Sequence, residues 1–132
     1  MKTKLTHNII FEETEMGLKP TEDLISGLIK LFSDTVHSVN VVDYTYEQID
    51  TWAPENIDPK KWMDRVKNNY MITAKDGNIV VGFGELTFEG CIDMLYVDKH
   101  YLLQKIGQQL LDFVINKASE LNMNEVFVKR RV

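Results

Sequence analysis

Cysteine is nearly absent from the chain, which excludes chemistry that depends on paired thiols. Cys91 is the one cysteine among 132 residues, so neither an intramolecular disulfide nor a Cys-x-x-Cys metal site can form. A chain without disulfides suits a reducing compartment, and we predict a cytoplasmic location. The three histidines, His7, His37 and His100, lie far apart without the spacing of metal ligands, so no metal site is predicted.

Long apolar runs and an excess of positive charge are also missing. No apolar stretch approaches the roughly 20 residues that a membrane-spanning helix needs, and none follows Lys2 and Lys4 as it would in a signal peptide. The formal net charge is -5, and the basic residues cluster only at Lys129-Arg130-Arg131. These features predict neither a membrane nor a nucleic acid as the main partner. The length and the 44% hydrophobic content fit one domain, residues 1–132, around one core.

The first half of the chain predicts an edge strand followed by helices. Residues 8–12 form a short apolar segment. Thr21 can cap a helix over residues 22–37, where apolar residues recur at helical spacing. A capping box at residues 45–48 and the pair Asp58-Pro59 predict two more helices. The apolar positions of the first and third helices are Leu24, Ile25, Leu28, Ile29, Phe32 and Val36, and then Trp62, Met63 and Val66.

In the second half the apolar period changes from helical spacing to alternation. Strands are predicted at 70–74, 79–86 and 91–97, with a hairpin turn at 75–78 that contains Asp76-Gly77. A helix from about Gln104 to Leu121 follows, packed through Ile106, Leu110 and Val114, and then a strand at 125–128. A strand, a crossover helix and another strand should place the last two strands parallel. The fold class is therefore α+β, a mixed and mostly antiparallel sheet with helices on both faces.

Two segments carry a more specific signal. Residues 44–54 read YTYEQIDTWAP, and residues 90–97 read GCIDMLYV. Together with the order of elements they resemble the GNAT superfamily of acyl-CoA-dependent N-acyltransferases, and more narrowly its YafP-like branch. The resemblance covers nearly the whole chain. It implies a GNAT-like fold, acetyl-CoA as co-substrate, and transfer of the acetyl group to a primary amine.

The chain departs from the family in its pyrophosphate loop and in its length. The family's loop usually runs Arg or Gln, two residues, Gly, one residue, then Gly or Ala. Aligning Gly107 with the last small residue puts Leu102 in the place of the Arg or Gln, and Lys105 in the place of the first Gly. Lys105 can add a positive charge beside phosphates, or it can obstruct the close approach that glycine permits. Family members also usually continue beyond the fifth strand, with an aromatic-rich segment, a Tyr proposed as general acid and a final strand, so the chain reads as truncated after the fifth strand.

The resemblance also implies where acetyl-CoA would bind. The strand before the turn would offer backbone groups to the pantetheine arm, and the turn with the start of the helix would face the pyrophosphate, because free N–H groups and the helix dipole favour an anion there. In this sequence the residues beside the pantetheine arm would be Leu95, Tyr96 and Val97. Those facing the pyrophosphate would be Leu103, Gln104, Lys105, Ile106, Gly107 and Gln108.

For the general base we predict Asp93 first and Glu85 second. Asp93 interrupts an apolar strand, and strands are depleted in Asp. Glu85 belongs to the neighbouring strand, so the two carboxylates can share a buried site in which a pKa rises towards working pH. The alternative is that both face solvent. Tyr44 and Trp52 are candidates for the acceptor pocket. The alternative is that they hold the second predicted helix on the core, and for Trp52 this alternative is favoured.

Three functions remain open on the sequence alone. The first is an acetyl-CoA-dependent N-acetyltransferase acting on a primary amine. The second is a catalytically weak or inactive module that binds CoA or a partner, which the altered loop favours. The third is a structural subunit that pairs through an exposed sheet edge, and such an edge also predicts a homodimer.

Overall fold

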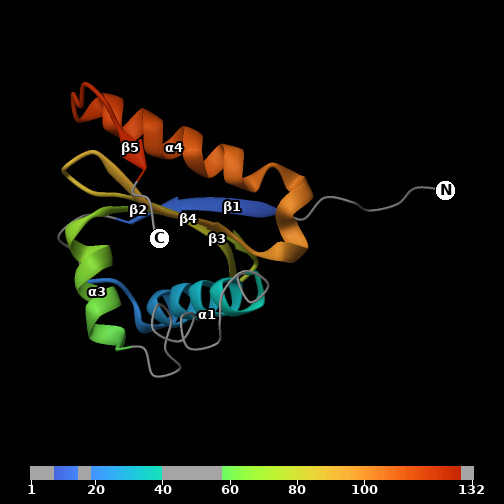
Figure 1. Ribbon diagram of the computed structural model, residues 1–132. Helices are drawn as coiled ribbons and strands as arrows, with labels where there is room; N and C mark the ends of the chain where they lie inside the picture. Colours follow the sequence, from blue (N-terminus) through green and yellow to red (C-terminus); the bar gives the residue numbers. More distant parts are fainter. Residues whose placement is uncertain (1–7, 15–18, 40–57, 129–132) are drawn as a thin grey trace.

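A single mixed sheet organises the molecule. The computed structural model describes residues 8–14, 19–39 and 58–128, apart from the side chains of residues 36–39 and 103. Figure 1 shows the sheet with α4 over one face and α1 and α3 over the other. The elements are β1 (Ile9–Glu13), α1 (Glu22–Val39), α3 (Pro59–Asn68), β2 (Tyr70–Asp76), β3 (Ile79–Leu86), β4 (Cys91–Val97), the 3-10 helix η2 (Lys99–Gln104), α4 (Ile106–Glu120) and β5 (Phe127–Val128).

The strands follow one another across the sheet in the order β1-β2-β3-β4-β5. The first four are antiparallel neighbours, and β5 lies parallel to β4. This confirms the predicted meander and the parallel final pair, and it confirms the α+β fold class. β1 is an edge strand, as expected from its short apolar segment.

Several boundaries differ from the prediction. The hairpin loop is only Gly77-Asn78, because Asp76 pairs with Ile79 and still belongs to β2. Gly77 adopts φ 64°, a left-handed conformation that glycine reaches without a Cβ clash. The last strand is limited to Phe127–Val128, because only two of the four predicted residues pair with β4.

Side-chain caps set the starts of α1 and α3. The Thr21 hydroxyl accepts a hydrogen bond of 3.1 Å from the Leu24 N–H. The Asp58 carboxylate accepts one of 3.0 Å from the Lys60 N–H, and Pro59 occupies the first helical position. The first N–H groups of a helix have no partner within it, so these caps satisfy donors that would otherwise be lost from hydrogen bonding. The two helices therefore begin where the sequence predicts.

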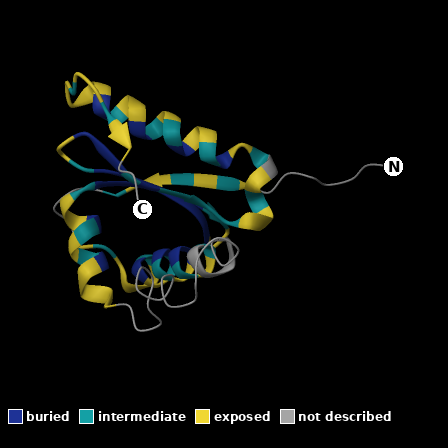
Figure 2. Cartoon of the chain, viewed as in Figure 1, coloured by how far each residue is buried: buried dark blue, intermediate teal, exposed yellow. Residues whose placement is uncertain are grey.

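The sheet separates two apolar layers, and Figure 2 shows the buried positions of the helices turned towards it. The first layer combines α1 and α3 with one face of the strands. Its buried members are Ile25, Leu28, Leu31, Phe32, Trp62, Val66, Met71, Val80, Phe83 and Met94. The second layer packs α4 against the other face through Ile106, Leu110, Val114 and Ala118. The predicted contact residues of α4 are confirmed.

Glycines in β3 let α4 lie close to the sheet. A Cβ added at Gly82 would lie 3.0 Å from Leu110 Cδ1 and 3.2 Å from both Ile106 Cγ2 and the Tyr96 backbone oxygen. A Cβ at Gly84 would lie 3.2 Å from Leu95 Cδ1 and 3.3 Å from Val114 Cγ2. The absence of side chains at these two positions therefore sets the distance between α4 and the sheet.

No helix in the described part of the chain combines the length and apolarity needed to cross a membrane.

We expect Gly82→Ala to lower the free energy of unfolding by about 1–3 kcal/mol, the usual cost of overpacking a dense core. Gly107→Ala is the matched control, because a Cβ there would meet only Val97 Cγ2, at an ordinary 3.5 Å. That variant should keep the stability of the wild type or gain up to about 1 kcal/mol from the higher helix propensity of alanine. Denaturant unfolding of both variants checks the pair. Equal stability of the two variants would contradict the close approach of α4.

Candidate functional site

Asp93 lies at an irregularity where β4 changes its partners. On the β3 side, Glu85 pairs with Met94 and Leu86 with Ile92. Asp93 is therefore the extra residue of a β-bulge. On the other side, the described pairing with β5 consists of Cys91 with Phe127 and Ile92 with Val128. Bulges often redirect a side chain beside an active site.

Arg65 of α3 connects the two predicted carboxylates. Its Nε donates to both oxygens of Glu85, at 2.7 and 2.8 Å, and its terminal NH2 group donates to Oδ2 of Asp93. Asn69, the C-cap residue of α3, donates to Oε2 of Glu85 at 2.9 Å. The guanidinium carbon lies 5.9 Å from the centre of the Trp62 ring. We call Arg65, Asn69, Glu85 and Asp93 the carboxylate cluster.

Burial differs sharply within the carboxylate cluster. The Glu85 side chain is 0% exposed, that of Asp93 14% and that of Arg65 28%. Burial raises the pKa of the Glu85 carboxyl above its ordinary value of 4.5, and the charge of Asp93 acts in the same direction. Arg65 and Asn69 act in the opposite direction, but burial is the larger effect. Neither carboxylate lies fully in solvent, so the solvent-facing alternative is wrong for this pair.

The sequence analysis did not identify Arg65 or Asn69, although a signal was present. Arg65 lies at helical spacing from Trp62, and Asn69 follows α3 directly as its C-cap residue. The exposed cations Lys60, Lys61 and Lys67 lie elsewhere on the same helix. A guanidinium beside an apolar stripe indicates a partly buried anion on the facing element.

The backbone of β4 offers groups to the edge that faces β5. The Asp98 N–H donates to the Val81 oxygen of β3 at 2.8 Å. Backbone groups alternate in direction along a strand, so those of Tyr96 point to β3 and those of Leu95 and Val97 to the opposite edge. The Tyr96 side chain packs among aromatic rings, 5.4 Å from Phe32 and 5.5 Å from Phe83 between ring centres.

The turn between β4 and α4 is longer than predicted. Leu103 and Gln104 end the 3-10 helix η2, and α4 begins at Ile106 rather than at Gln104. Between the two helices Lys105 adopts φ 59° and ψ 24°, the left-handed region. The Lys105 oxygen accepts the Gln109 N–H at 3.2 Å, so the N–H groups of Ile106, Gly107 and Gln108 precede the first such bond of α4. They form a helix start that can receive an anion.

Tyr101 and Asp98 hold this turn against the sheet. The Tyr101 hydroxyl donates to Oδ2 of Asp76 at 2.7 Å, which fastens η2 to the end of β2. The Asp98 carboxylate caps η2 by accepting the His100 N–H at 2.8 Å. Leu102, in contrast, is 61% exposed. Its apolar side chain offers no donor to a phosphate.

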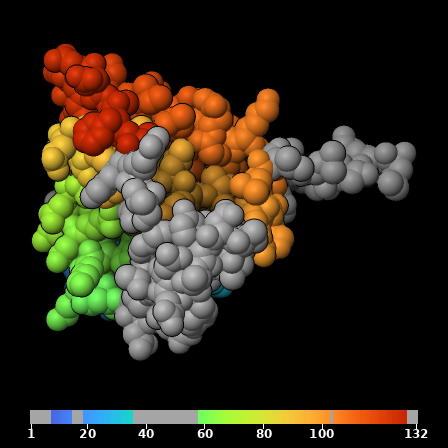
Figure 3. Space-filling view, viewed as in Figure 1, coloured from blue at the N-terminus to red at the C-terminus, as the bar shows by residue number. Residues whose placement is uncertain are grey.

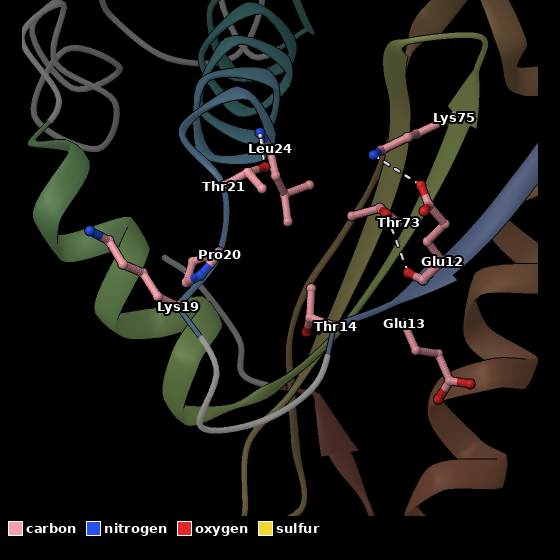
Figure 4. Close-up of a pocket in the computed structure, with 9 residues that line it drawn as sticks. All are labelled: Glu12, Glu13, Thr14, Lys19, Pro20, Thr21, Leu24, Thr73 and Lys75. Carbon is pink, nitrogen blue, oxygen red and sulfur yellow. Dashed lines mark hydrogen bonds and ion pairs between the residues drawn. The ribbon is translucent and has the colours of Figure 1, made fainter.

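A cavity elsewhere on the molecule belongs to a different region. This pocket has a volume of about 280 Å³ and lies between the start of α1 and strands β1 and β2 (Figure 4). Lys75 pairs with Glu12 there at 2.9 Å, and the Thr73 hydroxyl donates to the Glu12 backbone oxygen at 3.3 Å. The pocket touches β1 and β2, and β3 separates β2 from β4, the strand that carries Asp93. Its lining contains none of the predicted site residues.

Two further expectations meet limits of the described residues. Tyr44 and Trp52, the candidates for the acceptor pocket, lie outside them. In the parts of the chain that are described, no group of three or more His, Cys, Asp or Glu side chains could hold a metal ion.

Comparison with known proteins places this geometry in a family. The sequence profile of the acetyltransferase (GNAT) domain matches residues 40–132, well over half of the chain. The chain belongs to the GNAT acetyltransferase family. No curated protein matches it.

Solved structures agree with this GNAT assignment at the level of the fold. A GCN5-related N-acetyltransferase from Rhodopseudomonas palustris aligns with a TM-score of 0.71 and 22% identity, over 92% of this chain and 71% of that one. The PaiA N-acetyltransferase of Thermoplasma acidophilum, in complex with coenzyme A, aligns with a TM-score of 0.70 and 19% identity, over 86% and 75%. An aminoglycoside acetyltransferase from an uncultured soil sample, in complex with sisomicin, aligns with a TM-score of 0.64 and 19% identity, over 93% and 78%. At these identities the likeness establishes the GNAT fold alone.

In this GNAT chain β4 connects two regions, the carboxylate cluster and the start of α4. Figure 3 shows α3 beside the turn between β3 and β4, with the end of α4 and β5 next to it on the same face. The carboxylate cluster lies on the α3 side of the sheet, and α4 starts after the other end of β4. The edge of β4 joins them.

The raised pKa of Glu85 makes stability depend on pH with a definite sign. The folded chain retains the Glu85 proton at pH values where the unfolded chain has lost it. The stability that this group contributes is thus present below about pH 4.5 and is lost as the pH rises through the raised pKa. Glu85→Gln has no proton to lose. We expect the unfolding free energy of the wild type, minus that of Glu85→Gln, to fall as the pH rises above 4.5, by at most about 1.4 kcal/mol per pH unit. Chemical denaturation between pH 4 and pH 8 measures this difference, and a difference that rises with pH would contradict a Glu85 pKa raised by burial.

Proposed function

We propose that this GNAT protein transfers the acetyl group of acetyl-CoA to a primary amine, with Asp93 as the residue that receives the amine. One observation carries the proposal. The partly exposed carboxylate of Asp93 stands at a β-bulge of β4. A thioester that enters along the edge of β4 would therefore arrive beside a carboxylate.

The chemistry needs a deprotonated amine next to an electrophilic carbon. The amine nitrogen forms a bond to the acetyl carbon, the bond from that carbon to sulfur breaks, and CoA leaves as a thiol once its sulfur has gained a proton. An arriving ammonium group must first lose a proton, which Asp93 can accept or pass to water. Backbone N–H groups at the β4 edge can stabilise the negative charge that develops on the thioester oxygen.

Acetyl-CoA would be held by the backbone rather than by a large pocket. The groups of Leu95 and Val97 that point away from β3 can bind the amides of the pantetheine arm, in the manner of an added strand. The pyrophosphate would meet the N–H groups of Ile106, Gly107 and Gln108 at the start of α4, where the helix dipole is positive. Gly107 would contribute by lacking a side chain, which leaves room for a phosphate beside its N–H group. Leu103 and Gln104, which belong to η2, would contribute through the shape of the turn.

Lys105 takes a particular part in this turn. It stands where the family's loop has its first glycine, and its backbone is left-handed, the conformation that favours glycine. The chain thus keeps the glycine geometry with a lysine. The retained geometry supports a role for the charge of Lys105. That charge would offset the missing Arg or Gln at Leu102.

The acceptor is proposed from charge. One guanidinium faces two carboxylates, so the carboxylate cluster carries one surplus negative charge when both are ionised. A site of this kind attracts an ammonium group. Tyr44 and Trp52 remain candidates for the walls of the acceptor pocket. The likeness to an aminoglycoside acetyltransferase bound to sisomicin makes polyamines and amino sugars sensible first acceptors to test.

A second candidate is a GNAT domain that binds acetyl-CoA without turnover. Leu102 and Lys105 favour it, because each replaces a residue type that the family's loop uses for phosphate. Pairing with a second copy stays a prediction, and the exposed β5 residues Phe127 and Val128 are the surface on which it would depend.

Lys105 can be tested by acetyl-CoA titration. Lys105→Gln removes the charge but keeps a side chain on the left-handed backbone. Lys105→Gly removes both the charge and the side chain. We expect both variants to bind acetyl-CoA about two- to fivefold more weakly than the wild type, with a larger difference at low salt, where surface charges are least screened. Lys105→Gly alone should also gain up to about 1 kcal/mol of unfolding free energy. Calorimetry and thermal unfolding measure the two effects. Tighter binding by Lys105→Gly would show that the lysine obstructs the site.

Asp93 can be tested by turnover. We expect Asp93→Asn to lower kcat by roughly 10²–10⁴-fold, the range of a lost general base, with little change in acetyl-CoA affinity. The assay follows release of the CoA thiol with spermidine, lysine and kanamycin as acceptors. Asp34→Asn, an exposed carboxylate on α1, is the control for the loss of one negative charge. Acetyl-CoA binding without acetyl transfer in the wild type would favour the second candidate.

A further inference from the structure

Arg65 joins α3 to two neighbouring strands through one side chain. Glu85 lies 20 positions away in the sequence and Asp93 28 positions away. Salt bridges on a surface contribute little to stability, but this one holds a carboxylate that has no exposure at all. Resting on the proposed acetyl transfer, we propose that Arg65 is the positioning residue that orients the Asp93 carboxylate towards the acceptor amine.

The first support is that the position of Arg65 is itself fixed. Its Nε contacts both oxygens of Glu85 within 0.1 Å of the same distance, at 2.7 and 2.8 Å. The guanidinium is planar, so this contact sets the direction of the NH2 group that reaches Asp93. Glu85 cannot turn away easily, because it is fully buried and accepts a hydrogen bond from Asn69. The chain of contacts runs from Asn69 through Glu85 and Arg65 to Asp93.

The second support is that the strand does not fix Asp93. Residues in a regular ladder are oriented by a partner on the neighbouring strand. Asp93 is the extra residue of the bulge, outside the regular register of β3 and β4. Arg65 contacts its carboxylate from α3, so an element outside the sheet orients it.

The third support concerns Glu85. A carboxylate with 0% exposure cannot touch an acceptor that enters from solvent. Glu85 contacts Arg65 and Asn69 instead, so its effect on the reaction passes through Arg65. Of the two carboxylates predicted from the sequence, Asp93 contacts the amine and Glu85 supports the residue that orients Asp93.

The experiment compares Arg65→Gln and Arg65→Lys with the wild type, each alone and combined with Asp93→Asn. Lysine keeps the charge but lacks the planar fork that spans two carboxylates. We expect both single variants to lower kcat on the order of 10²-fold, the cost of a misplaced catalytic group, with the dissociation constant for acetyl-CoA unchanged. In the Asp93→Asn background the same substitutions should have no further effect, because the group they orient is gone. Lys61→Gln removes one exposed cation from the same helix and is the control.

The outcomes separate the inference from the function on which it rests. Losses that multiply in the double variants would overturn the role of Arg65 while leaving acetyl transfer intact. A wild type that binds acetyl-CoA but acetylates none of spermidine, lysine and kanamycin would overturn the proposed function, and this inference with it. If Arg65→Gln fails to fold, Arg65→Lys decides the question, because it keeps a cation beside Glu85.

Chemical rescue distinguishes positioning from support of the fold. Arg65→Ala with methylguanidine added at millimolar concentration should regain part of its kcat, because the added cation can occupy the space between the two carboxylates. A purely structural role predicts higher stability without a gain in kcat. That result would overturn the inference.

Discussion

Glu85 introduces a carboxylate into the interior between α3 and the sheet, where an ionised group without partners costs several kcal/mol. Arg65 and Asn69 supply the partners, and both come from α3. The position of α3 on the sheet is thus tied to a charge as well as to the apolar contacts of Trp62 and Val66. Because Arg65 also reaches Asp93, the same interaction connects α3 to β4 at the point where the described pairing with β5 ends.

The other face of the sheet depends on close packing rather than on charge. Gly82 and Gly84 leave room for Ile106, Leu110 and Val114, so α4 lies directly on β3. The start of α4 is held in turn by Tyr101 through Asp76, and by the capped 3-10 helix. These contacts fix where the first N–H groups of α4 point. A charge-based face and a packing-based face therefore meet at one strand, β4, whose edge offers the backbone groups of Leu95 and Val97.

This division explains how a GNAT fold can keep a binding turn whose side chains differ from the family's usual loop. Backbone N–H groups and the helix dipole do not depend on side-chain identity, so an anion site can survive the change to Leu102 and Lys105. The left-handed backbone at Lys105 supports this proposal of a retained anion site, because the turn keeps a conformation that favours glycine. Catalysis is more demanding. The acetyl transfer that we propose requires a carboxylate in one orientation, and in this proposal the planar guanidinium of Arg65 provides it.

Local patterns in the sequence determined the elements and the layers. The bounds of β3 and β4 and the starts of α1 and α3 follow from alternation, from Thr21 and from Asp58, because each pattern involves residues within a few positions of one another. That Glu85 and Asp93 lie on neighbouring strands could also be predicted, since the hairpin order puts β3 beside β4. Only the tertiary structure decided that Asp93 is a bulge, that Lys105 is left-handed and that Arg65 holds both carboxylates. Those features depend on strand register, on how closely a helix approaches the sheet and on contacts 20 and 28 positions apart, which local patterns do not encode.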